Sequence, residues 1–504
     1  MIYPAMDEGM KSLSSLLAGL GPYECEAELF FSDIQQDSRR VSPGCLFVAL
    51  NGLHRHGLEF ADQAIRGGCS GIIYDPEAGG SELVKAVKTV RCIPVENLGT
   101  KLAEVSKRFF DHPSKDLIVV GITGTNGKTS TSHFLVEAAS SKFRGAVIGT
   151  LGWGTPGDLS DTSHTTPDPI EIQRILASLK KAGYQLVVVE ASSHGLHQGR
   201  LAGVDFNGAV FTNITRDHLD YHLSLEAYID AKMAILGFDQ LSFVVSNADD
   251  PCQATINERI RKGVKHIQFS KKPSGTHMVS TKTVEQTSKG ISFDLCFERF
   301  RQRVNVPVFG VFNVENLMAT AGALLGLGFG ETETAEALVR VKPVPGRMER
   351  VISANPPVVI DYAHTPDALK NALQALREHC GGKLWVVFGC GGDRDKGKRP
   401  QMGEVAALMA DVVILTDDNP RSEKSEDIIR DITSGMPIGR AIVIPCRSQA
   451  IQYAVEGAAV NDLILIAGKG HECTQEINGV KFHFVDREEV EKASKGRNLL
   501  SETV

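Results

Sequence analysis

Short apolar runs, each followed by polar residues, recur through the middle of the chain. They occupy Leu117 to Ile122, Leu186 to Val189, Ala209 to Phe211 and Phe243 to Val245. Apolar runs of this length are typical of buried parallel strands, and the segments between them are compatible with helices. Ligands of open α/β sheets bind at the carboxyl ends of the strands, so we expect the polar residues after these runs to converge on one crevice.

The last third of the chain repeats this pattern. Its apolar runs are Val358 to Ile360, Leu384 to Phe388, Val412 to Leu415 and Leu463 to Ile466. Polar or glycine residues again follow each run: Asp361, Gly389, Asp417-Asp418 and Gly468-Lys469-Gly470. The repetition predicts a second doubly wound sheet with its own strand-end crevice.

Two proline-containing segments divide the chain, His112 to Lys115 and Val341 to Gly346. Proline discourages continuous helix or sheet, so both segments are candidate linkers. We therefore predict an α/β protein of three domains, at residues 1–112, 113–344 and 345–504. A chain of 504 residues agrees with that number.

Composition narrows the class of protein. Hydrophobic residues make up 42% of the chain and charged residues 23%, as in soluble globular proteins. The net charge of -7 gives no sign of binding to nucleic acid or an anionic membrane. Ten scattered cysteines without a C-x-x-C pair indicate a reducing compartment and buried thiols. With no apolar run of membrane-spanning length and no signal-like N-terminus, we expect a cytoplasmic protein.

The segment Gly124-Thr125-Asn126-Gly127-Lys128-Thr129 follows the first apolar run and precedes a helix-compatible stretch from Ser130 to Ser140. Glycines let backbone amides surround an oxyanion, Lys128 adds positive charge, and the Thr129 hydroxyl can ligate magnesium. The pattern predicts a loop that binds a nucleoside triphosphate. It is a variant loop, because the first glycine of the usual spacing is replaced by Ile122.

Other candidates are less specific. Glu190, at the end of its run, could hold magnesium together with Thr129. His218 and His222 have the i, i+4 spacing that can chelate a transition metal on a helix, or His218 alone could belong to a magnesium site. On spacing alone, Lys232 is an ordinary helix-surface lysine. Two further segments could be plain turns: the glycine-rich cationic stretch from Gly389 to Arg399, which would also suit an anionic group, and Asp418 to Arg421.

Several motifs occur together in one order and closely resemble the Mur ligases, which build the peptide stem of bacterial peptidoglycan. They are Gly124 to Thr129, Glu190 to Leu196, Thr212 to His222, Asp361 to Pro366 and Asp418 to Arg421. The segments Asp37 to Arg39 and Gly52 to Gly57 look like the uridine-nucleotide module of these enzymes. The resemblance therefore implies an N-terminal uridine-nucleotide-binding α/β domain, a central P-loop ATPase-like domain and a C-terminal Rossmann-like domain.

The resemblance implies an ATP-dependent ligation of meso-diaminopimelate to UDP-N-acetylmuramoyl-L-alanyl-D-glutamate through an acyl phosphate. ATP would be the co-substrate and Mg²⁺ the cofactor. The other partners would be these small molecules alone, in a monomeric protein without nucleic acid or membrane.

Residue roles follow from the matched motifs. For ATP they are Gly124, Thr125, Asn126, Gly127, Lys128, Thr129, Asn313, Asn316, Arg347 and Asp361. For the UDP-linked substrate they are Ser38, Leu53, His54, Arg55, His164, Thr165, Thr166, Ser192, Gln198 and Arg200. For diaminopimelate they are Arg394, Asp418, Asn419, Pro420, Arg421, Gly468 and Glu472. The implied metal ligands are Thr129, Glu190, His218 and Lys232 as a carbamate, and the implied catalytic residues are Lys128, His218 and Lys232. His164 departs from the family pattern, which has asparagine there.

The amino-acid substrate follows from one physical difference. Diaminopimelate carries a second carboxylate that lysine lacks, and the planar guanidinium of Arg421 can bind a carboxylate through two parallel hydrogen bonds. Three alternatives stay open: a lysine-adding variant of the same ligase, a ligase similar to folylpolyglutamate synthase, and a nucleotide-dependent switch that ligates nothing.

Overall fold

The computed structural model describes residues 9–21, 28–52, 55–162, 164–272, 278–287, 290–298, 300–351 and 353–501. Contacts divide the chain into two compact units. The first holds residues 1–132, 139–246 and 250–266, and the second holds residues 133–138, 247–249 and 267–504. The domain boundaries near residues 112 and 344 stay a prediction.

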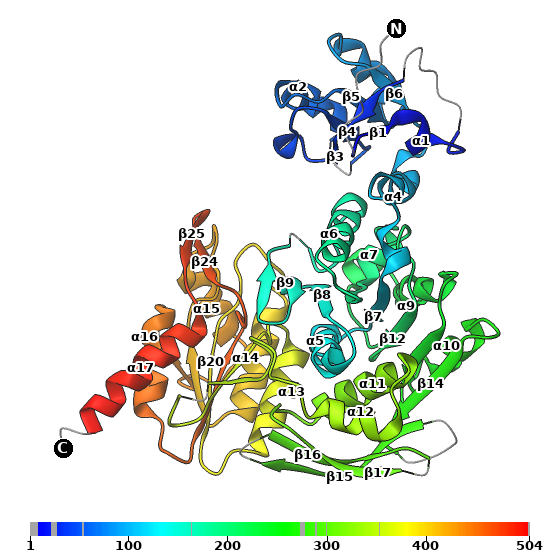
Figure 1. Ribbon diagram of the computed structural model, residues 1–504. Coiled ribbons are helices and arrows are strands. Elements are labelled where there is room, and N and C mark those ends of the chain that lie inside the picture. Colours follow the sequence, from blue (N-terminus) through cyan, green and yellow to red (C-terminus); the bar gives the residue numbers. More distant parts are fainter. Residues whose placement is uncertain are drawn as a thin grey trace. The chain divides into compact units, whose positions relative to one another are not determined.

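The first unit begins with a small parallel sheet, in blue in Figure 1, whose strand order is β3-β4-β5-β6. The elements of this part of the chain are β1 (Lys11–Ser12), α1 (Leu13–Leu17), β2 (Phe30–Phe31), β3 (Asp33–Gln35), β4 (Cys45–Ala49), α2 (Ala61–Arg66), β5 (Gly71–Tyr74), α3 (Gly80–Leu83), β6 (Cys92–Pro94) and α4 (Leu98–Phe109). Strands β1 and β2 form a separate antiparallel pair. Two apolar clusters cover its faces, one including α1 and α4 and the other including α2. The alternation of side chains along β4 explains this, since Leu46 and Phe47 enter opposite clusters.

The rest of the first unit is built on a larger sheet of order β10-β9-β8-β11-β7-β12-β13. Its elements are β7 (Ile118–Thr123), α5 (Lys128–Ala138), β8 (Gly145–Gly149), β9 (Gly152–Thr155), β10 (Asp158–Ser160), α6 (Pro169–Lys181), β11 (Leu186–Glu190), α7 (Ser193–His197), β12 (Gly208–Phe211), α8 (Leu219–His222), α9 (Leu225–Met233), β13 (Phe243–Asn247) and α10 (Gln253–Arg259). The second half of α5, residues 133–138, belongs to the second unit. Strands β8, β11, β7, β12 and β13 are parallel, which confirms the four predicted runs. The chain leaves β7 toward β8 on one side and later reaches β12 on the other, so the predicted loop lies where a ligand crevice is expected.

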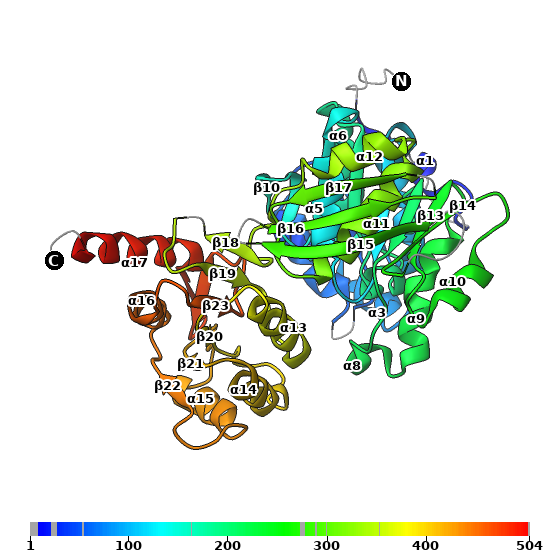
Figure 2. The ribbon, with the colours of Figure 1, turned by 90° about the horizontal axis from the view of Figure 1, so that it is seen from below.

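The second unit begins with a sheet segment of order β14-β15-β16-β17, mostly antiparallel. Its elements are β14 (Lys265–Ser270), β15 (Met278–Thr287), β16 (Gly290–Cys296), β17 (Arg301–Val306), α11 (Phe312–Gly326) and α12 (Glu331–Leu338). Helices α11 and α12 lie against one face of β15 to β17, as Figure 2 shows.

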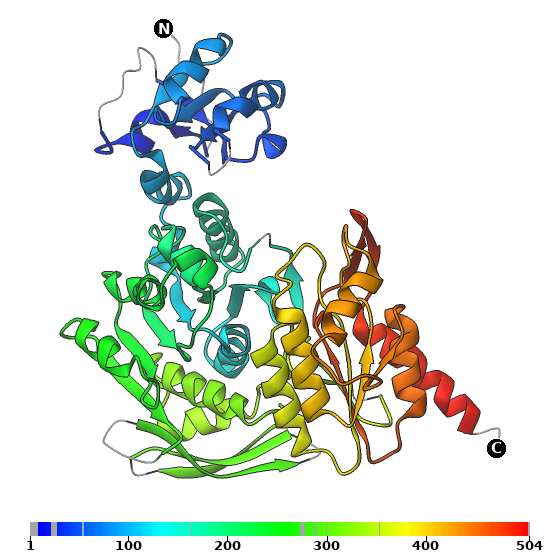
Figure 3. The same cartoon turned by 180° about the vertical axis from the view of Figure 1, so that it is seen from behind.

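The remainder of the second unit is the other predicted doubly wound sheet, of order β18-β19-β23-β20-β21-β22. Its elements are β18 (Glu349–Val351), β19 (Val358–Asp361), α13 (Pro366–Arg377), β20 (Leu384–Phe388), α14 (Lys398–Met409), β21 (Val412–Leu415), α15 (Ser425–Thr433), β22 (Ala441–Val443), α16 (Arg447–Gly457), β23 (Leu463–Ala467), β24 (Thr474–Ile477), β25 (Val480–His483) and α17 (Asp486–Ser501). Within the sheet of order β18-β19-β23-β20-β21-β22, all pairings except β18 with β19 are parallel, and β24 and β25 form a separate antiparallel pair. Figure 3 shows helices on both sides of this sheet, and each face of the sheet has its own apolar cluster. The α/β class with parallel sheets is thus confirmed.

Two remaining predictions concern membranes and thiols. Among the described residues, no helix is both long enough and apolar enough to cross a membrane. The prediction of buried thiols is wrong for Cys446 and Cys473, which are exposed. Both lie outside the helices and strands, Cys446 directly before α16 and Cys473 directly before β24.

Candidate active site

The loop after β7 is held in shape by hydrogen bonds to the segment after β12. Thr125 N donates to Asn213 O at 2.7 Å, and Asn126 N donates to Asn213 Oδ1 at 3.0 Å. Thr212 Oγ1 donates to Asn126 O at 2.6 Å. Gly124 has φ 148°, and a Cβ there would lie 1.9 Å from Thr212 Oγ1. Only glycine fits this position, so the loop is fixed by packing as well as by conformation.

The missing first glycine has a structural explanation. Ile122 is a fully buried residue of β7, paired with Glu190 on one side and Val210 on the other. Because the strand continues through this position, the loop begins only at Gly124. At its other end Lys128 bends back, and its ammonium donates to the carbonyls of Gly124 and Thr125 at 2.9 Å each.

Glu190 is the buried carboxylate of this site. Thr129 Oγ1 donates to its Oε2 at 3.0 Å, so the structure brings together two of the predicted metal ligands. Thr150 also binds Glu190, with N to Oε1 at 3.0 Å and Oγ1 to Oε2 at 3.1 Å. The sequence interpretation missed Thr150, although its position directly after β8 is the same strand-end signal that singled out Glu190. A hydroxyl beside a carboxylate is an oxygen donor set that suits Mg²⁺.

The spacing of Lys232 suggested a lysine on the surface of a helix, but the structure places it in the interior. The residue is only 1% exposed, and its Nζ donates to Gly124 O at 2.7 Å and lies 4.5 Å from the ring centroid of Tyr228. Burial, and next the charge of Lys128, lower the pKa of Lys232 well below its ordinary value. Helix α9 therefore turns this amine toward the back of the phosphate loop, where the neutral form is favoured.

His218 and His222, the i, i+4 pair, do not both lie within one helix. His218 precedes α8 in the left-handed conformation, with φ 51°, while His222 is the last residue of this short helix. The half-exposed His218 ring packs edge-on against His194, with centroids 4.8 Å apart. In the part of the chain that the structure describes, no group of three or more His, Cys, Asp or Glu residues could hold a metal ion. The geometry thus gives no support to a histidine-based transition-metal site.

Four residues that the resemblance assigns to the muramoyl-peptide form one hydrogen-bonded group, and a fifth, Thr165, reaches Glu190 only through Thr150. Thr166 Oγ1 donates to Ser192 Oγ at 2.9 Å, and Arg200 donates to Thr166 O at 2.8 Å and to Gln198 Oε1 at 2.9 Å. Thr165 Oγ1 lies 3.0 Å from the Thr150 hydroxyl that binds Glu190. The group therefore extends from the buried carboxylate outward to Arg200.

The rest of the set assigned to the UDP-linked substrate is more dispersed. His164 is exposed. Ser38 is buried and donates to Gln63 Oε1 at 2.8 Å, whereas the Arg55 side chain is 66% exposed. Leu53 and His54 lie outside the described residues. The uridine-binding roles stay predictions.

In the second unit, the residues that the resemblance assigns to ATP form two pairs: Arg347 with Asp361, and Asn313 with Asn316. The Arg347 guanidinium lies 4.7 Å from the ring centroid of Tyr362, and burial raises the pKa of Asp361. Asn313 and Asn316 lie in the first turns of α11, joined by a hydrogen bond of 2.8 Å from Asn316 Nδ2 to Asn313 Oδ1.

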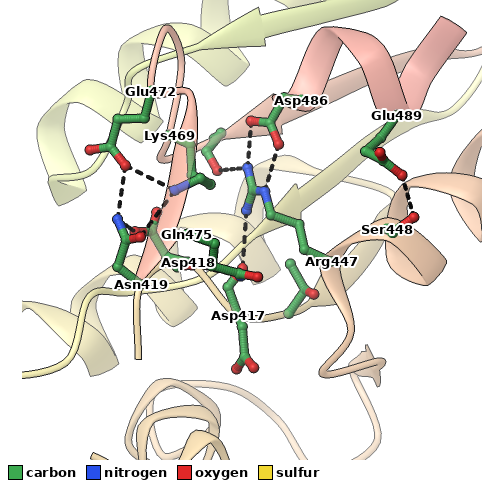
Figure 4. Close-up of polar contacts among 12 residues, drawn as sticks. Asp417, Asp418, Asn419, Arg447, Ser448, Lys469, Glu472, Gln475, Asp486 and Glu489 are labelled. Carbon is green, nitrogen blue, oxygen red and sulfur yellow. Dashed lines mark hydrogen bonds and ion pairs between the residues drawn. The ribbon is translucent and has the colours of Figure 1, made fainter. Parts of the chain in front are cut away.

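The predicted amino-acid site is a buried polar network at the ends of β21 and β23 (Figure 4). Asn419 Nδ2 donates to Asp418 Oδ1 at 3.1 Å and to Glu472 Oε2 at 2.8 Å. Lys469, whose side chain is fully buried, donates to Asn419 Oδ1 at 3.1 Å and to Glu472 Oε2 at 2.9 Å. The Asn419 amide is thereby oriented with its oxygen toward a cation and its nitrogen toward two carboxylates. A Cβ at Gly468, which has φ 112°, would lie 2.5 Å from Asp418 Oδ2, so only glycine leaves that oxygen accessible.

Two predicted arginines meet at the glycine-rich loop after β20: Arg394 belongs to this loop, and Arg421 contacts it. Arg421 has φ 50° and donates from Nη1 to Gly392 O at 2.7 Å. A Cβ on Gly391 would come within 2.9 Å of Arg421 Nη1 and 3.6 Å of Arg394 Cγ. The structure thus brings both predicted arginines to one loop. The role of Lys469 was missed by the sequence interpretation, although it stands between two predicted glycines at a strand end.

The fold and these contacts define the class: a P-loop nucleotide-binding protein with a second doubly wound domain that carries its own charged site. Three family descriptions match the chain: "Mur ligase family, catalytic domain" over residues 31–110, "Mur ligase middle domain" over residues 122–324, and "Mur ligase, glutamate ligase domain" over residues 346–470. The chain belongs to the Mur ligase family.

Relatives of known name agree in length. The chain is 42% identical over 474 residues to a UDP-N-acetylmuramoyl-L-alanyl-D-glutamate--2,6-diaminopimelate ligase of Coxiella burnetii, covering 93% of this chain and 96% of the relative. It is 44% identical over 466 residues to the ligase of the same name from Chromobacterium violaceum, covering 91% and 93%. A solved structure of a ligase of this name is 36% identical, with a TM-score of 0.68, covering 96% of this chain and 99% of that one. A Mycobacterium tuberculosis folylpolyglutamate synthase, covering 79% of this chain and 95% of its own, has a TM-score of 0.61 at 16% identity and shares the fold.

Proposed function

We propose that this protein is an ATP-dependent ligase that adds meso-diaminopimelate to the D-glutamate of UDP-N-acetylmuramoyl-L-alanyl-D-glutamate, a step of peptidoglycan biosynthesis. The proposal rests on one observation above all: Asp418, Glu472 and Arg421 follow β21 and β23, the two strands that flank β20, and their charges match an ammonium and a carboxylate. The names of the similar ligases support the same substrate.

The phosphate loop would bind ATP through its backbone amides and through Lys128. The Lys128 ammonium donates to two carbonyls of the loop, so a rotation of the side chain would bring it to a bound phosphate. Thr129 and Glu190 would hold Mg²⁺, which supplies positive charge that offsets the charge of the phosphate oxygens.

Lys232 is proposed to carry a carbamate. Its amine would add to carbon dioxide, forming an N–C bond and releasing one proton to solvent. Burial beside Gly124 O and Tyr228 favours the neutral, nucleophilic amine that this addition requires. The product would place a negatively charged oxygen group where the buried amine lies.

Ligation would proceed in two transfers. A side-chain carboxylate oxygen of the substrate's D-glutamate attacks the γ-phosphorus of ATP, and ADP leaves. The diaminopimelate amine then attacks the acyl carbon, phosphate leaves with the electron pair of the C–O bond, and the amine loses a proton. The Thr166, Ser192 and Arg200 group is proposed to orient the acceptor, since positioning two reactants contributes much of such a rate enhancement.

The second site would select the amino acid. Asp418 and Glu472 are proposed to bind one ammonium of diaminopimelate, and Arg421 and Arg394 its distal carboxylate. Lysine has no such carboxylate, so its binding would lack the contact between the arginines and the substrate. We further propose that the enzyme works as a cytoplasmic monomer on these small molecules, without nucleic acid or membrane.

The test is ADP release by the full chain with ATP, Mg²⁺ and the UDP-muramoyl-dipeptide, in separate reactions with meso-diaminopimelate and L-lysine, plus a reaction with a folate and glutamate. We expect turnover only with meso-diaminopimelate and a product whose mass equals the dipeptide plus diaminopimelate minus water. Preference for lysine or for the folate pair would replace the proposal with the corresponding ligase. ADP release without any acceptor would identify a nucleotide-dependent switch.

A further inference from the structure

A buried ion pair lies behind the amino-acid site and is not part of the residues assigned to it. Arg447 begins α16, Asp486 begins α17, and both side chains are 0% exposed. The guanidinium binds the carboxylate through two parallel hydrogen bonds, Nε to Oδ1 at 2.7 Å and Nη2 to Oδ2 at 2.8 Å. This is the strong bidentate geometry of an arginine and a carboxylate.

The same guanidinium also reaches two backbone carbonyls at strand ends. Arg447 Nη2 donates to Ala467 O at 3.0 Å, and Nη1 lies within hydrogen-bond distance, 3.4 Å, of Asp417 O. Ala467 is the last residue of β23, directly before Gly468, and Asp417 directly precedes Asp418. One cation therefore holds the starts of the two loops that carry the amino-acid site, as Figure 4 shows.

Energetics argue against a role in stability alone. Removing two charges from water costs free energy that their mutual attraction often only offsets, so a buried pair is weak evidence for stabilisation and a well-packed apolar pair would often stabilise the fold as well. An apolar pair could not, however, fix the separation of two backbone carbonyls. The value of Arg447 lies in geometry that only a forked donor can supply.

Electrostatics point in the same direction. Burial raises the pKa of Asp418, and the charges of Arg447 and Lys469 oppose that rise. Asp418 must be anionic to bind an ammonium. Lys469 contacts Asn419 and Glu472 directly, whereas Arg447 acts from behind, through the backbone.

We propose that Arg447, held by Asp486, is a positioning residue for the amino-acid substrate: it fixes the Asp418 turn relative to the Gly468 loop so that Asp418 and Glu472 bind one ammonium together. This inference rests on the proposed function. It also assigns a role to α17, because the first residue of this helix, Asp486, is the counter-ion of Arg447.

The test compares Arg447→Lys, Arg447→Met and Asp486→Asn in the full chain, with KM measured separately for meso-diaminopimelate and for ATP. We expect at least a tenfold rise in KM for meso-diaminopimelate in Arg447→Met, a smaller rise in Arg447→Lys and Asp486→Asn, and KM for ATP within twofold of the parent. A lysine at position 447 keeps the positive charge but lacks the forked donor that contacts both Asp417 O and Ala467 O. Arg447→Lys therefore separates the effect of the charge from the effect of the geometry.

Asp462→Asn is the matched control. Asp462 is a buried carboxylate that precedes the opposite end of β23 and accepts hydrogen bonds from Lys383 N at 2.7 Å and Trp385 Nε1 at 2.9 Å. This substitution should lower the unfolding temperature while leaving both KM values unchanged. It shows what a purely structural change in the same domain does.

Equal rises in both KM values, or no rise in a folded Arg447 variant, would overturn the inference. Failure of all three variants to fold would do the same, because it would assign the pair to stability. An inactive parent protein would instead defeat the proposed function.

Discussion

The phosphate loop and the amino-acid site both lie at the carboxyl ends of parallel strands, but they are built from different atoms. In the loop, backbone amides and carbonyls of Thr125 and Asn126 make most of the contacts, with the Asn213 amide in support. In the amino-acid site, the contacts join the charged or amide side chains of Asp418, Asn419 and Glu472.

This difference teaches what each kind of recognition requires. A phosphate is bound by any well-placed set of N–H groups and a cation, so a short glycine-rich motif is sufficient. An amino acid with two carboxylates and two amines must be told from a near relative, and this needs fixed charges of both signs. Backbone sites should thus depend on few side chains, and the charged site on many.

Lys128→Ala should give the largest effect. Among the residues of the loop, Lys128 is the one that supplies a side-chain cation, so its loss should lower kcat by about 10³-fold with an unchanged unfolding temperature. Steady-state kinetics and thermal denaturation measure the two quantities. Lys181→Ala, at an exposed position at the end of α6, is the control and should keep full activity. Near-normal turnover of the Lys128 variant would contradict the role of the loop.

Lys232→Ala should follow, with kcat lower by about 10²-fold because the proposed carbamate would be lost. Short carboxylates such as acetate should restore part of the activity, since they can occupy the vacated space as anions. Intact-mass measurement of the native protein should show an added carbon dioxide at neutral pH. An active protein with an unmodified Lys232 ammonium would refute this prediction.

Arg421→Ala sharpens the comparison from the other side. Loss of one partner of a charged hydrogen bond should lower kcat/KM for meso-diaminopimelate by about 30- to 100-fold, while KM for ATP stays near its original value. Arg430→Ala removes an exposed arginine of the same domain and should change neither. Equal losses toward both substrates would argue that Arg421 supports the fold instead of the substrate.

The smallest effect concerns acid stability in the second unit. Burial first, and then the charges of Arg347 and His471, lower the pKa of His133 to about 4. The unfolded chain takes up this proton below about pH 6.5, so stability contributed by neutral His133 is lost as pH falls from 6.5 toward 4. The free energy of unfolding should therefore fall less in His133→Gln than in the parent protein between pH 6.5 and 4.5, by on the order of 2 kcal/mol. Urea unfolding at both pH values measures this difference. The exposed His483→Gln should leave the slope unchanged, and an equally steep His133 variant would contradict the argument.

Much of the fold could be predicted from local patterns. Buried parallel strands read as uninterrupted apolar runs, and all eight predicted runs are strands. Two helices also begin as local rules favour, although the sequence analysis did not use these signals: Asp168 caps α6 and Thr365 caps α13, each with proline in the first turn. Long-range contacts left no such local trace, which is why the spacing of Lys232 suggested an exposed lysine.

The sequence by itself determined the order of strands and helices along the chain, the position of the phosphate loop and the set of polar residues at strand ends. Those features depend on periodicity and on glycine, which are properties of neighbouring residues. Only the tertiary structure decided that Thr150 binds Glu190, that Lys232 is buried and that Arg447 joins two loops to Asp486. These contacts join segments far apart in the chain, so they arise only when sheet order and helix packing bring them together.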